Sequence, residues 1–255
     1  MPIKVGLFGF GRTGSVVASE IAKDPALSLQ WVCRRHTESN QTYASRSLGH
    51  DSDFAPFVSI DDMSESFLET YPVDMVIDFS TGTTTQIYDK LASLKIKVVS
   101  AISNYNDQEL SRVKAASSNT AVLYSPNITL GINWLLMASK ILKSMIPHAD
   151  IEVVEEHFRQ KKDISGTALK LARHLDLDPK EHVNSIRVGG IVGKHEVIFG
   201  LPYQTIRLVH ESINRAAFGT GAIFAAKWLR NQPHGFYSME QVLQETFKQK
   251  LREIQ

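Results

Sequence analysis

The chain has little cysteine: Cys33 is the single one among 255 residues. One cysteine cannot form an internal disulfide framework or a multi-cysteine metal site, and so low a content is typical of the reducing cytoplasm. Because Cys33 ends an apolar segment, we expect a buried structural thiol rather than a nucleophile. No spacing of His, Asp and Glu indicates a metal site either. The sequence therefore predicts a cytoplasmic protein without a metal centre.

Long apolar runs and an excess of either charge are also lacking. No run approaches the roughly 18 apolar residues that a transmembrane helix requires. The formal net charge is +1, which gives no electrostatic reason to expect binding to nucleic acid or to an anionic membrane. With 43% hydrophobic and 22% charged residues, the composition is that of an ordinary globular protein. A chain of this length forms one large domain or two modest ones.

What the sequence does have is a series of regularly spaced glycines near its start. A predicted strand over 3–8 leads into Gly9-Phe10-Gly11-Arg12-Thr13-Gly14, and a helical pattern follows over 14–23. The spacing G-x-G-x-x-G between a strand and a helix is typical of a dinucleotide pyrophosphate site, because the glycines allow a tight turn, close approach of backbone to phosphate, and helix–strand packing. The helix N-terminus adds N–H donors and a positive dipole end. We therefore predict that these six residues bind a dinucleotide, with a plain strand–turn–helix as the alternative.

The end of the next predicted strand, 28–33, bears on which dinucleotide is bound. An acidic residue there usually holds the ribose hydroxyls of NAD, whereas arginine accommodates the 2′-phosphate of NADP. This chain has no acidic residue at that point. It has Arg34 and Arg35 there instead, and their guanidinium groups offer bidentate donors to a phosphate. Arg12 in the glycine turn is a further candidate, and His36 is a weaker one. The sequence favours NADPH as the cofactor over NADH, which is the second candidate. The alternative interpretation of the two arginines is a solvated basic turn that binds no phosphate.

The order of predicted elements changes halfway along the chain. Strands are predicted at 3–8, 28–33, 57–60, 74–79, 97–102 and 121–124, and helices at 14–23, 62–70, 83–93 and 106–117. This alternation is typical of a parallel α/β sheet. Beyond 125–127 the predicted order is helix 130–146, strand 151–158, helix 166–175, strands 184–189, 195–200 and 204–210, and helices 217–230 and 239–252. Strands in succession indicate an antiparallel or mixed sheet.

The predicted fold is therefore α/β, with an N-terminal Rossmann-type doubly wound parallel sheet and a smaller α+β domain with a mixed sheet. We expect the tail to pack back on the first domain. The prediction is a discontinuous dinucleotide-binding domain over 1–127 and 217–255, and a substrate-binding and oligomerisation domain over 128–216.

The densest polar cluster of the sequence lies over 155–167. His157 could relay a proton near neutral pH, and Lys161 could donate to a developing nitrogen anion or bind an anionic substrate. Ser165-Gly166-Thr167 opens a predicted helix, where hydroxyls and N–H groups could hold a carboxylate. The alternative is a charged, solvated turn with an ordinary N-cap serine.

Motifs along almost the whole chain resemble those of the dihydrodipicolinate reductase family. They lie at 9–14, 76–80, 126–133, 156–167, 187–195, 210–229 and 235–239. The resemblance implies an NAD(P)H-dependent oxidoreductase of lysine and diaminopimelate biosynthesis, which reduces hydroxy-tetrahydrodipicolinate, a small dicarboxylate, to tetrahydrodipicolinate. It also implies a homotetramer that forms through the second domain.

The same resemblance assigns roles to individual residues. His157 matches the family's proposed proton donor, and Lys161 matches the lysine that assists protonation and binds substrate. Ser165, Gly166 and Thr167 match the loop that binds a substrate carboxylate. The residues expected to line the cofactor site, besides the glycine turn and the arginine pair, are Ser80, Ser100, Ala101, Pro126 and Asn127.

The chain departs from the family pattern at four places. Phe158 stands where the family has a second histidine, and Ile164 replaces the A-P that precedes S-G-T. Ser100-Ala101-Ile102-Ser103 stands where the family has G-T-T-G, and the glycine turn is one residue shorter than the commonest family form. Two alternatives follow: a related reductase of another imine or amino-acid-derived substrate, and a non-catalytic NADP-binding sensor.

Overall fold

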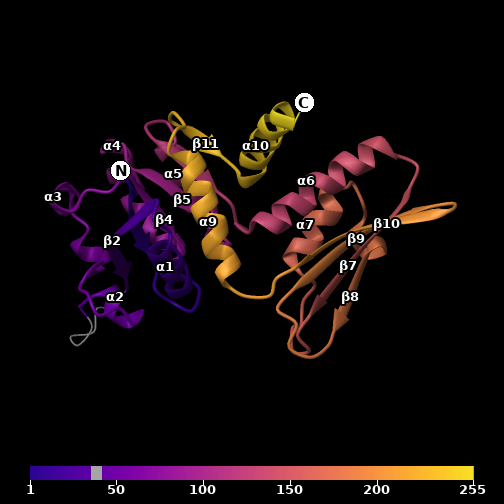
Figure 1. The fold of residues 1–255 in the computed structure, drawn as a ribbon, viewed down its shortest axis with the longest axis horizontal. Coiled ribbons are helices and arrows are strands. Elements are labelled where there is room, and N and C mark those ends of the chain that lie inside the picture. The colour runs from indigo at the N-terminus through magenta and orange to yellow at the C-terminus, as the bar shows by residue number, and fades with distance from the viewer. Residues whose placement is uncertain (36–41, 255) are drawn as a thin grey trace. The chain divides into compact units, whose positions relative to one another are not determined.

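The computed structural model describes residues 1–35 and 42–254, which divide into two compact units (Figure 1). Unit 1 consists of Met1–Thr129 and Phe218–Val242, and unit 2 consists of Leu130–Ala217 and Leu243–Gln255. Our expected boundaries assigned all of 217–255 to the first domain, whereas residues from Leu243 onward group with unit 2. Within unit 2, the ring of Phe247 packs edge-on against Trp134 at 5.5 Å between centroids.

Unit 1 is built on a seven-stranded parallel sheet. Its strands are β1 (Ile3–Phe8), β2 (Leu27–Arg34), β3 (Phe57–Ser59), β4 (Met75–Asp78), β5 (Lys97–Ser100), β6 (Ala121–Tyr124) and β11 (Gly235–Tyr237). The spatial order is β11-β6-β5-β4-β1-β2-β3, and every paired strand runs parallel to its neighbour. The chain order therefore reverses between β1 and β4, which is the point at which this fold binds ligands. The predicted doubly wound parallel sheet is confirmed.

Helices cover both faces of this sheet. They are α1 (Gly14–Lys23), α2 (Ala44–Ser47), α3 (Glu65–Thr70), α4 (Tyr88–Ser93), α5 (Asp107–Ala116) and α9 (Ala216–Leu229), with short 3-10 helices η1 (Ile60–Asp62) and η2 (Gly82–Ile87). One core packs Val5 and Leu7 against Val17 of α1 and Leu229 of α9. The opposite core packs β-strand residues such as Val76 against α4 and α5. Because both faces are buried, the central strands are almost continuously apolar, as the sequence indicated.

Two short elements of unit 1 differ from the predictions. The predicted helix at 83–93 begins as the 3-10 helix η2, where Thr85 donates a side-chain hydrogen bond to the carbonyl of Gly82 at 2.6 Å and the Thr84 hydroxyl lies 2.8 Å from the carbonyl oxygen of Thr81. Such local hydrogen bonds compete with regular helix formation. Strand β11 was missed because three residues are too few to show a period.

Unit 2 combines a four-stranded mixed sheet with helices. Its elements are α6 (Leu130–Met145), β7 (Asp150–His157), α7 (Gly166–His174), α8 (Pro179–His182), β8 (Val183–Arg187), β9 (Lys194–Leu201), β10 (Gln204–Glu211) and most of α10 (Met239–Ile254). The order is β10-β9-β7-β8, in which β7 and β8 are parallel and the other pairs antiparallel. The predicted mixed sheet is confirmed, and α8 was missed.

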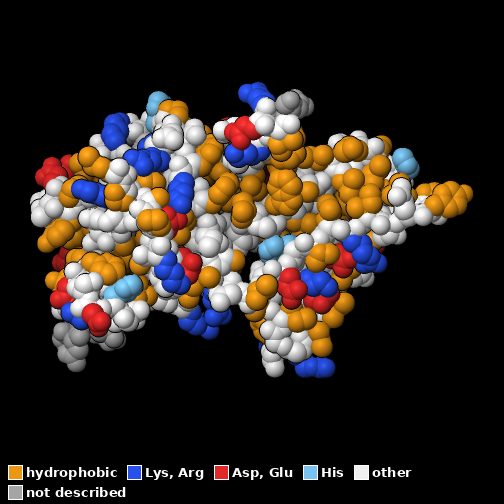
Figure 2. Space-filling model, in the orientation of Figure 1, with side chains coloured by type: hydrophobic (Ala, Val, Ile, Leu, Met, Phe, Trp, Pro, Cys, Tyr) orange, Lys and Arg blue, Asp and Glu red, His pale blue; other side chains and the backbone are white. Residues whose placement is uncertain are grey.

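One face of this sheet packs against α6 and α7. Val153, Val197 and Phe199 of the strands meet Leu136 of α6 and Leu171 of α7 in an apolar core. On the molecular face drawn in Figure 2, acidic and basic side chains are intermixed on both units. Within the described residues, no helix is long and apolar enough to cross a membrane.

Candidate functional site

The glycine turn between β1 and α1 requires glycine for different reasons at different positions. Gly9 has φ +94°, and a methyl group on it would lie 2.8 Å from the carbonyl oxygen of Phe79. A methyl group on Gly14 would lie 2.1 Å from the carbonyl oxygen of Gly9, so the helix can start here only without a side chain. At Gly11, by contrast, no atom lies within 4 Å of that position. The turn is thus closed at Gly9 and Gly14 and open at Gly11, where a phosphate has room.

A pocket of about 420 Å³ adjoins this turn and also reaches the arginine pair. Its lining residues are Gly9, Phe10, Gly11, Cys33, Arg34, Arg35, Ile60, Phe79, Ser80, Thr81, Thr83 and Thr84. The guanidinium of Arg34 lies 3.8 Å from the centroid of the Phe57 ring, and Arg35 is exposed at the end of β2. Arg12 is exposed and lines neither this pocket nor the one described below. His36 lies outside the described residues.

Cys33 contributes to the same pocket as a thiol. Burial, followed by the charge of Asp78, raises the pKa of Cys33 to about 12. The side chain is buried and stays protonated at neutral pH. The predicted structural role of Cys33 therefore agrees with its surroundings.

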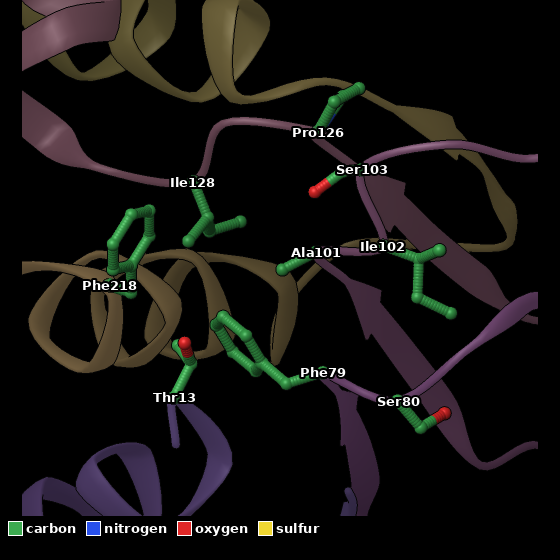
Figure 3. Close-up of a pocket in the computed structure, with 9 residues that line it drawn as sticks. All are labelled: Thr13, Phe79, Ser80, Ala101, Ile102, Ser103, Pro126, Ile128 and Phe218. Carbon is green, nitrogen blue, oxygen red and sulfur yellow. The ribbon is translucent and has the colours of Figure 1, made fainter. Parts of the chain in front are cut away.

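A second pocket of about 190 Å³ lies at the carboxyl ends of β4, β5 and β6 (Figure 3). Its lining residues are Thr13, Phe79, Ser80, Ala101, Ile102, Ser103, Pro126, Ile128 and Phe218. Four predicted cofactor residues, Thr13, Ser80, Ala101 and Pro126, thus meet in one pocket. Besides Arg12, the predicted cofactor residues that line neither pocket are Gly14, Ser100 and Asn127. Phe79 and Ser80 border both cavities, so the two pockets adjoin at the reversal point of the sheet.

A buried carboxylate fixes the strand ends beneath these pockets. Asp78 is fully buried and accepts hydrogen bonds from the Ser80 hydroxyl and N–H, the Thr84 hydroxyl and the Tyr88 hydroxyl, at 2.6, 2.9, 2.6 and 2.8 Å. Burial raises the pKa of Asp78, although these donors oppose the rise. The Tyr105 hydroxyl lies 2.6 Å from that of Ser100. Accordingly, the Ser80 hydroxyl points away from the pocket centre in Figure 3.

A second buried carboxylate, Glu155, organises unit 2. Its two oxygens accept hydrogen bonds from the Arg187 guanidinium at 2.9 and 2.6 Å, the Ser185 hydroxyl at 2.7 Å and the Ser165 N–H at 3.2 Å, and Oε2 also contacts Nδ1 of His157. Burial alone would raise the pKa of Glu155, but these donors lower it to about 2. Glu155 is therefore ionised at neutral pH, and Nδ1 of His157 donates to it.

The position of this pair follows from strand geometry. Successive side chains of a strand point to opposite faces, so Glu155 and His157 lie on the same face of β7 as Val153. Both side chains are buried, as Val153 is, but they lie at the end of the strand beyond the apolar core of unit 2. Nε2 of His157 faces Gly193. A methyl group added to Gly193 would lie only 3.1 Å from Nε2. With Nδ1 bound to Glu155, Nε2 is the nitrogen that remains for proton transfer.

Arg187 uses all five of its N–H donors. Besides the two bonds to Glu155, it donates to the carbonyl oxygens of Lys161, Asp163 and Ile186, each at 3.0 Å. A guanidinium with five satisfied donors is a rigid support. It ties the loop that carries the half-buried Lys161 to the same carboxylate that holds His157.

The predicted carboxylate-binding segment begins α7. Ser165 is the N-cap residue, but its hydroxyl does not cap the helix; instead Oγ lies 2.8 Å from Nε2 of His195. No atom lies within 4 Å of a methyl group placed on Gly166, and Thr167 follows in the first turn. Glu155 thus binds the backbone of Ser165 as well as the ring of His157, which brings the predicted proton donor and this segment together.

Glu155, Arg187 and His195 were not among the residues predicted for the site. The family motif at 156–167 begins at Glu156, but Glu156 points to the opposite face of β7, where Lys194 pairs with it at 2.6 Å. The alternation of the strand, counted back from His157, would have indicated Glu155. The position of His195 at the end of the motif 187–195 indicates a structural or interface histidine rather than a ligand. The described residues contain no group of three or more His, Cys, Asp or Glu side chains arranged to bind a metal.

Comparisons with known proteins give a consistent result. Family models described as dihydrodipicolinate reductase, N-terminus and C-terminus, match residues 3–128 and 131–243. The 4-hydroxy-tetrahydrodipicolinate reductase of Sulfurimonas denitrificans is 33% identical over 95% of this chain and 99% of its own length. The same enzyme of Caldanaerobacter subterraneus is 35% identical, over 67% and 76%. The solved dipicolinate-bound dihydrodipicolinate reductase from Paenisporosarcina sp. TG-14 has the same fold, with a TM-score of 0.78, 21% identity and coverage of 94% and 99%.

Proposed function

The chain belongs to the dihydrodipicolinate reductase family, and from this premise we propose that it reduces hydroxy-tetrahydrodipicolinate to tetrahydrodipicolinate with NADPH, in lysine and diaminopimelate biosynthesis. The chain is an oxidoreductase that uses a pyridine nucleotide. The structural observation that carries the proposal is the ionised Glu155, which binds both His157 and the segment that begins at Ser165. The dipicolinate in the related structure supports a small dicarboxylate as the substrate class.

The residues of unit 1 fit a dinucleotide. The open backbone at Gly11 leaves room for the pyrophosphate, and the adjoining pocket contains Arg34 and Arg35, which would bind a 2′-phosphate. Ser80, Ala101 and Pro126 would surround the nicotinamide end, with Ser100 and Asn127 shaping the strand ends behind it. When bound, the nucleotide supplies the hydride. The arginine pair supports NADPH over NADH.

Two glycine substitutions separate cofactor binding from folding. Gly14→Ala is expected to lower the free energy of unfolding by about 1–3 kcal/mol, because its methyl group collides with the Gly9 carbonyl. Gly11→Ala should leave the melting temperature unchanged but raise the Kd for NADPH about ten- to a hundredfold, since its methyl group occupies the space for the phosphates. Thermal unfolding and fluorescence titration measure the two effects. Equal NADPH affinity in Gly11→Ala and wild type would contradict the site.

Removal of the arginine pair tests the choice of nucleotide. Arg34→Ala/Arg35→Ala is expected to raise KM for NADPH about tenfold or more and to leave KM for NADH unchanged, because a charge-assisted hydrogen bond contributes about 1.5–3 kcal/mol. Arg46→Ala is the matched control, since Arg46 pairs with Asp53 at 2.5 Å and does not line the pocket. Equal losses for both nucleotides would refute the 2′-phosphate assignment.

The proton-transfer part of the reaction belongs to unit 2. Ser165, Gly166 and Thr167 would bind a substrate carboxylate, and Lys161 would bind the substrate and support the developing negative charge. His157 would deliver the proton from Nε2 while its Nδ1–H donates to ionised Glu155, which fixes the orientation of the ring. The Arg187 bonds keep Glu155 and the Lys161 loop in place throughout.

The decisive experiment follows NADPH oxidation with freshly generated hydroxy-tetrahydrodipicolinate. Turnover by the wild type supports the proposal. NADPH binding without turnover of this substrate would contradict it. In that case the changed strand end at 100–103, where Ser100 bonds with Tyr105, would favour a reductase of another imine.

The uncovered face of the unit 2 sheet supports the expected homotetramer. It exposes Ile186 and Val209, flanked by ion pairs such as Arg207–Glu196 at 2.5 Å. Ile186 and Val209 lie on the two edge strands, and the Glu156–Lys194 pair and Glu196 lie between them, so an interface between copies here would combine apolar side chains at the edges with ion pairs in the middle. The tetramer and the cytoplasmic location stay predictions.

A further inference from the structure

His195 is a buried histidine that the proposed reaction does not use. It lies on β9 directly opposite Glu155 on β7 and His210 on β10, and only 6% of its surface is exposed. Its ring packs edge-on against that of His157, with 5.3 Å between centroids. Its single hydrogen-bond partner within the described part of the chain is the hydroxyl of Ser165, 2.8 Å from Nε2, while Nδ1 is buried without one.

The ring of His195 is neutral at physiological pH. Burial, followed by the nearby His157 and His210, lowers the pKa of His195 to about 4. A neutral imidazole carries one hydrogen, either on Nε2 or on Nδ1. The location of that hydrogen decides the direction of the hydrogen bond with Ser165.

The two tautomers of His195 differ in which buried hydrogen-bonding group is left without a partner. With the hydrogen on Nδ1, a buried N–H would lack an acceptor, which is rare in proteins and costs about 1–3 kcal/mol. Nε2 would then accept the hydrogen of Ser165 and turn the lone pairs of the serine oxygen toward any ligand. With the hydrogen on Nε2, His195 donates to Ser165, and the serine hydrogen is available to a ligand. The second arrangement is favoured, and it suits a carboxylate, which only accepts hydrogen bonds.

We propose that His195 is a positioning residue that donates to Ser165 and thereby makes the Ser165 hydroxyl a hydrogen-bond donor to a substrate carboxylate. The role rests on the proposed function, in which the segment from Ser165 to Thr167 binds that carboxylate. It also gives His195 a part in specificity, because the donor recognises an anionic group at this position. The backbone of Ser165 is held as well, since its N–H donates to Glu155.

The test compares two substitutions of His195. His195→Phe keeps the ring and removes the donor, whereas His195→Gln places an amide nitrogen near the position of Nε2. We expect His195→Phe to raise substrate KM and the Kd for dipicolinate about tenfold or more, as for a lost hydrogen bond to a charged group. The kcat should change less than about threefold and the Kd for NADPH not at all, since the proton donor and unit 1 are untouched. His195→Gln should restore most of the dipicolinate affinity.

A double-mutant cycle covers the case in which His195→Phe folds poorly. His195→Asn then replaces it, because its amide nitrogen lies near the position of Nδ1 and not of Nε2, so the donor to Ser165 is lost. Ser165→Ala and His195→Asn should each weaken dipicolinate binding to a similar degree, and adding His195→Asn to Ser165→Ala should change nothing further. In parallel, nitrogen-15 NMR of histidine-labelled protein, assigned by the signals missing in His195→Gln, should show hydrogen on Nε2 in the dipicolinate complex.

The outcomes separate the two proposals. A wild type that binds dipicolinate while His195→Phe binds it equally well overturns the role of His195 alone, as does hydrogen on Nδ1 or an equal fall in kcat and kcat/KM. A wild type that neither binds dipicolinate nor turns over hydroxy-tetrahydrodipicolinate overturns the proposed function, and the role of His195 with it.

Discussion

His157→Asn is expected to lower kcat about 10²- to 10⁴-fold, the usual contribution of a positioned general acid. Asparagine places an amide nitrogen near the position of Nδ1, so the hydrogen bond to Glu155 is kept while the nitrogen at Nε2 is lost. The Kd for NADPH and the melting temperature should therefore stay close to the wild-type values. Steady-state kinetics with hydroxy-tetrahydrodipicolinate and thermal unfolding measure both effects.

The end of helix α8, beside the same sheet, offers a matched control. His182 also contacts a glutamate through Nδ1, at 3.0 Å from Glu152, but both side chains are partly exposed. His182→Asn should leave kcat unchanged. A similar loss of kcat in both variants would indicate a general effect on the sheet rather than a specific proton donor. Full activity of His157→Asn would refute the role of His157.

Much of the fold could be predicted because local signals were strong. The turn from Gly9 to Gly14 follows a buried strand and precedes a helix, and the alternation of strands and helices indicated a parallel sheet. The change to successive strands beyond 183 predicted the mixed sheet of unit 2. The grouping of 243–255 with unit 2 could not be predicted, because it depends on packing such as that of Phe247 on Trp134.

The candidate site was harder to predict because its contacts join distant parts of the chain. His157, Lys161 and Ser165 came from a compact motif and lie near one another along the chain. Arg187 lies 32 residues from Glu155, and the pairing of β7 with β8 aligns Glu155 with Ser185 and His157 with Arg187. Strand register of this kind depends on tertiary packing. The internal hydrogen bond of Ser100 likewise depends on Tyr105, which no motif identified.

Glu155→Gln is expected to lower the free energy of unfolding by about 3 kcal/mol, near the lower end of the range for breaking a buried ion pair. Glu155 is fully buried, and its neutral replacement leaves Arg187, of which 20% of the side chain is exposed, without a counter-charge. The kcat should also fall, because Nδ1 of His157 loses the ionised acceptor that orients its ring, but by less than the about 10²- to 10⁴-fold expected when the proton donor itself is removed. Denaturant unfolding and steady-state kinetics are the measurements.

Glu156→Gln is the control for this substitution, because the neighbouring residue receives the same change on the opposite face of β7. Glu156 pairs with Lys194 near the surface, and partly exposed pairs contribute about 0–1 kcal/mol. Its stability should therefore stay within about 1 kcal/mol of the wild type. If both variants lose the same unfolding free energy, the hydrogen bonds between Glu155 and Arg187 contribute no more to stability than the surface pair of Glu156 with Lys194.

The pH dependence of stability shows whether Glu155 stabilises the fold through its negative charge or through the packing of its side chain. The pKa of Glu155 falls from an ordinary 4.5 to about 2 on folding, so the folded state binds its proton less readily than the unfolded chain does. The stabilisation is fully present above about pH 4.5 and is lost as the pH falls through about 2. Glutamine cannot titrate, so the difference in unfolding free energy between wild type and Glu155→Gln should be constant above pH 4.5 and shrink progressively down to pH 2. A difference that stays unchanged across this range would mean that the amide disturbs packing, and that Arg187 and His157 do not depend on an ionised partner.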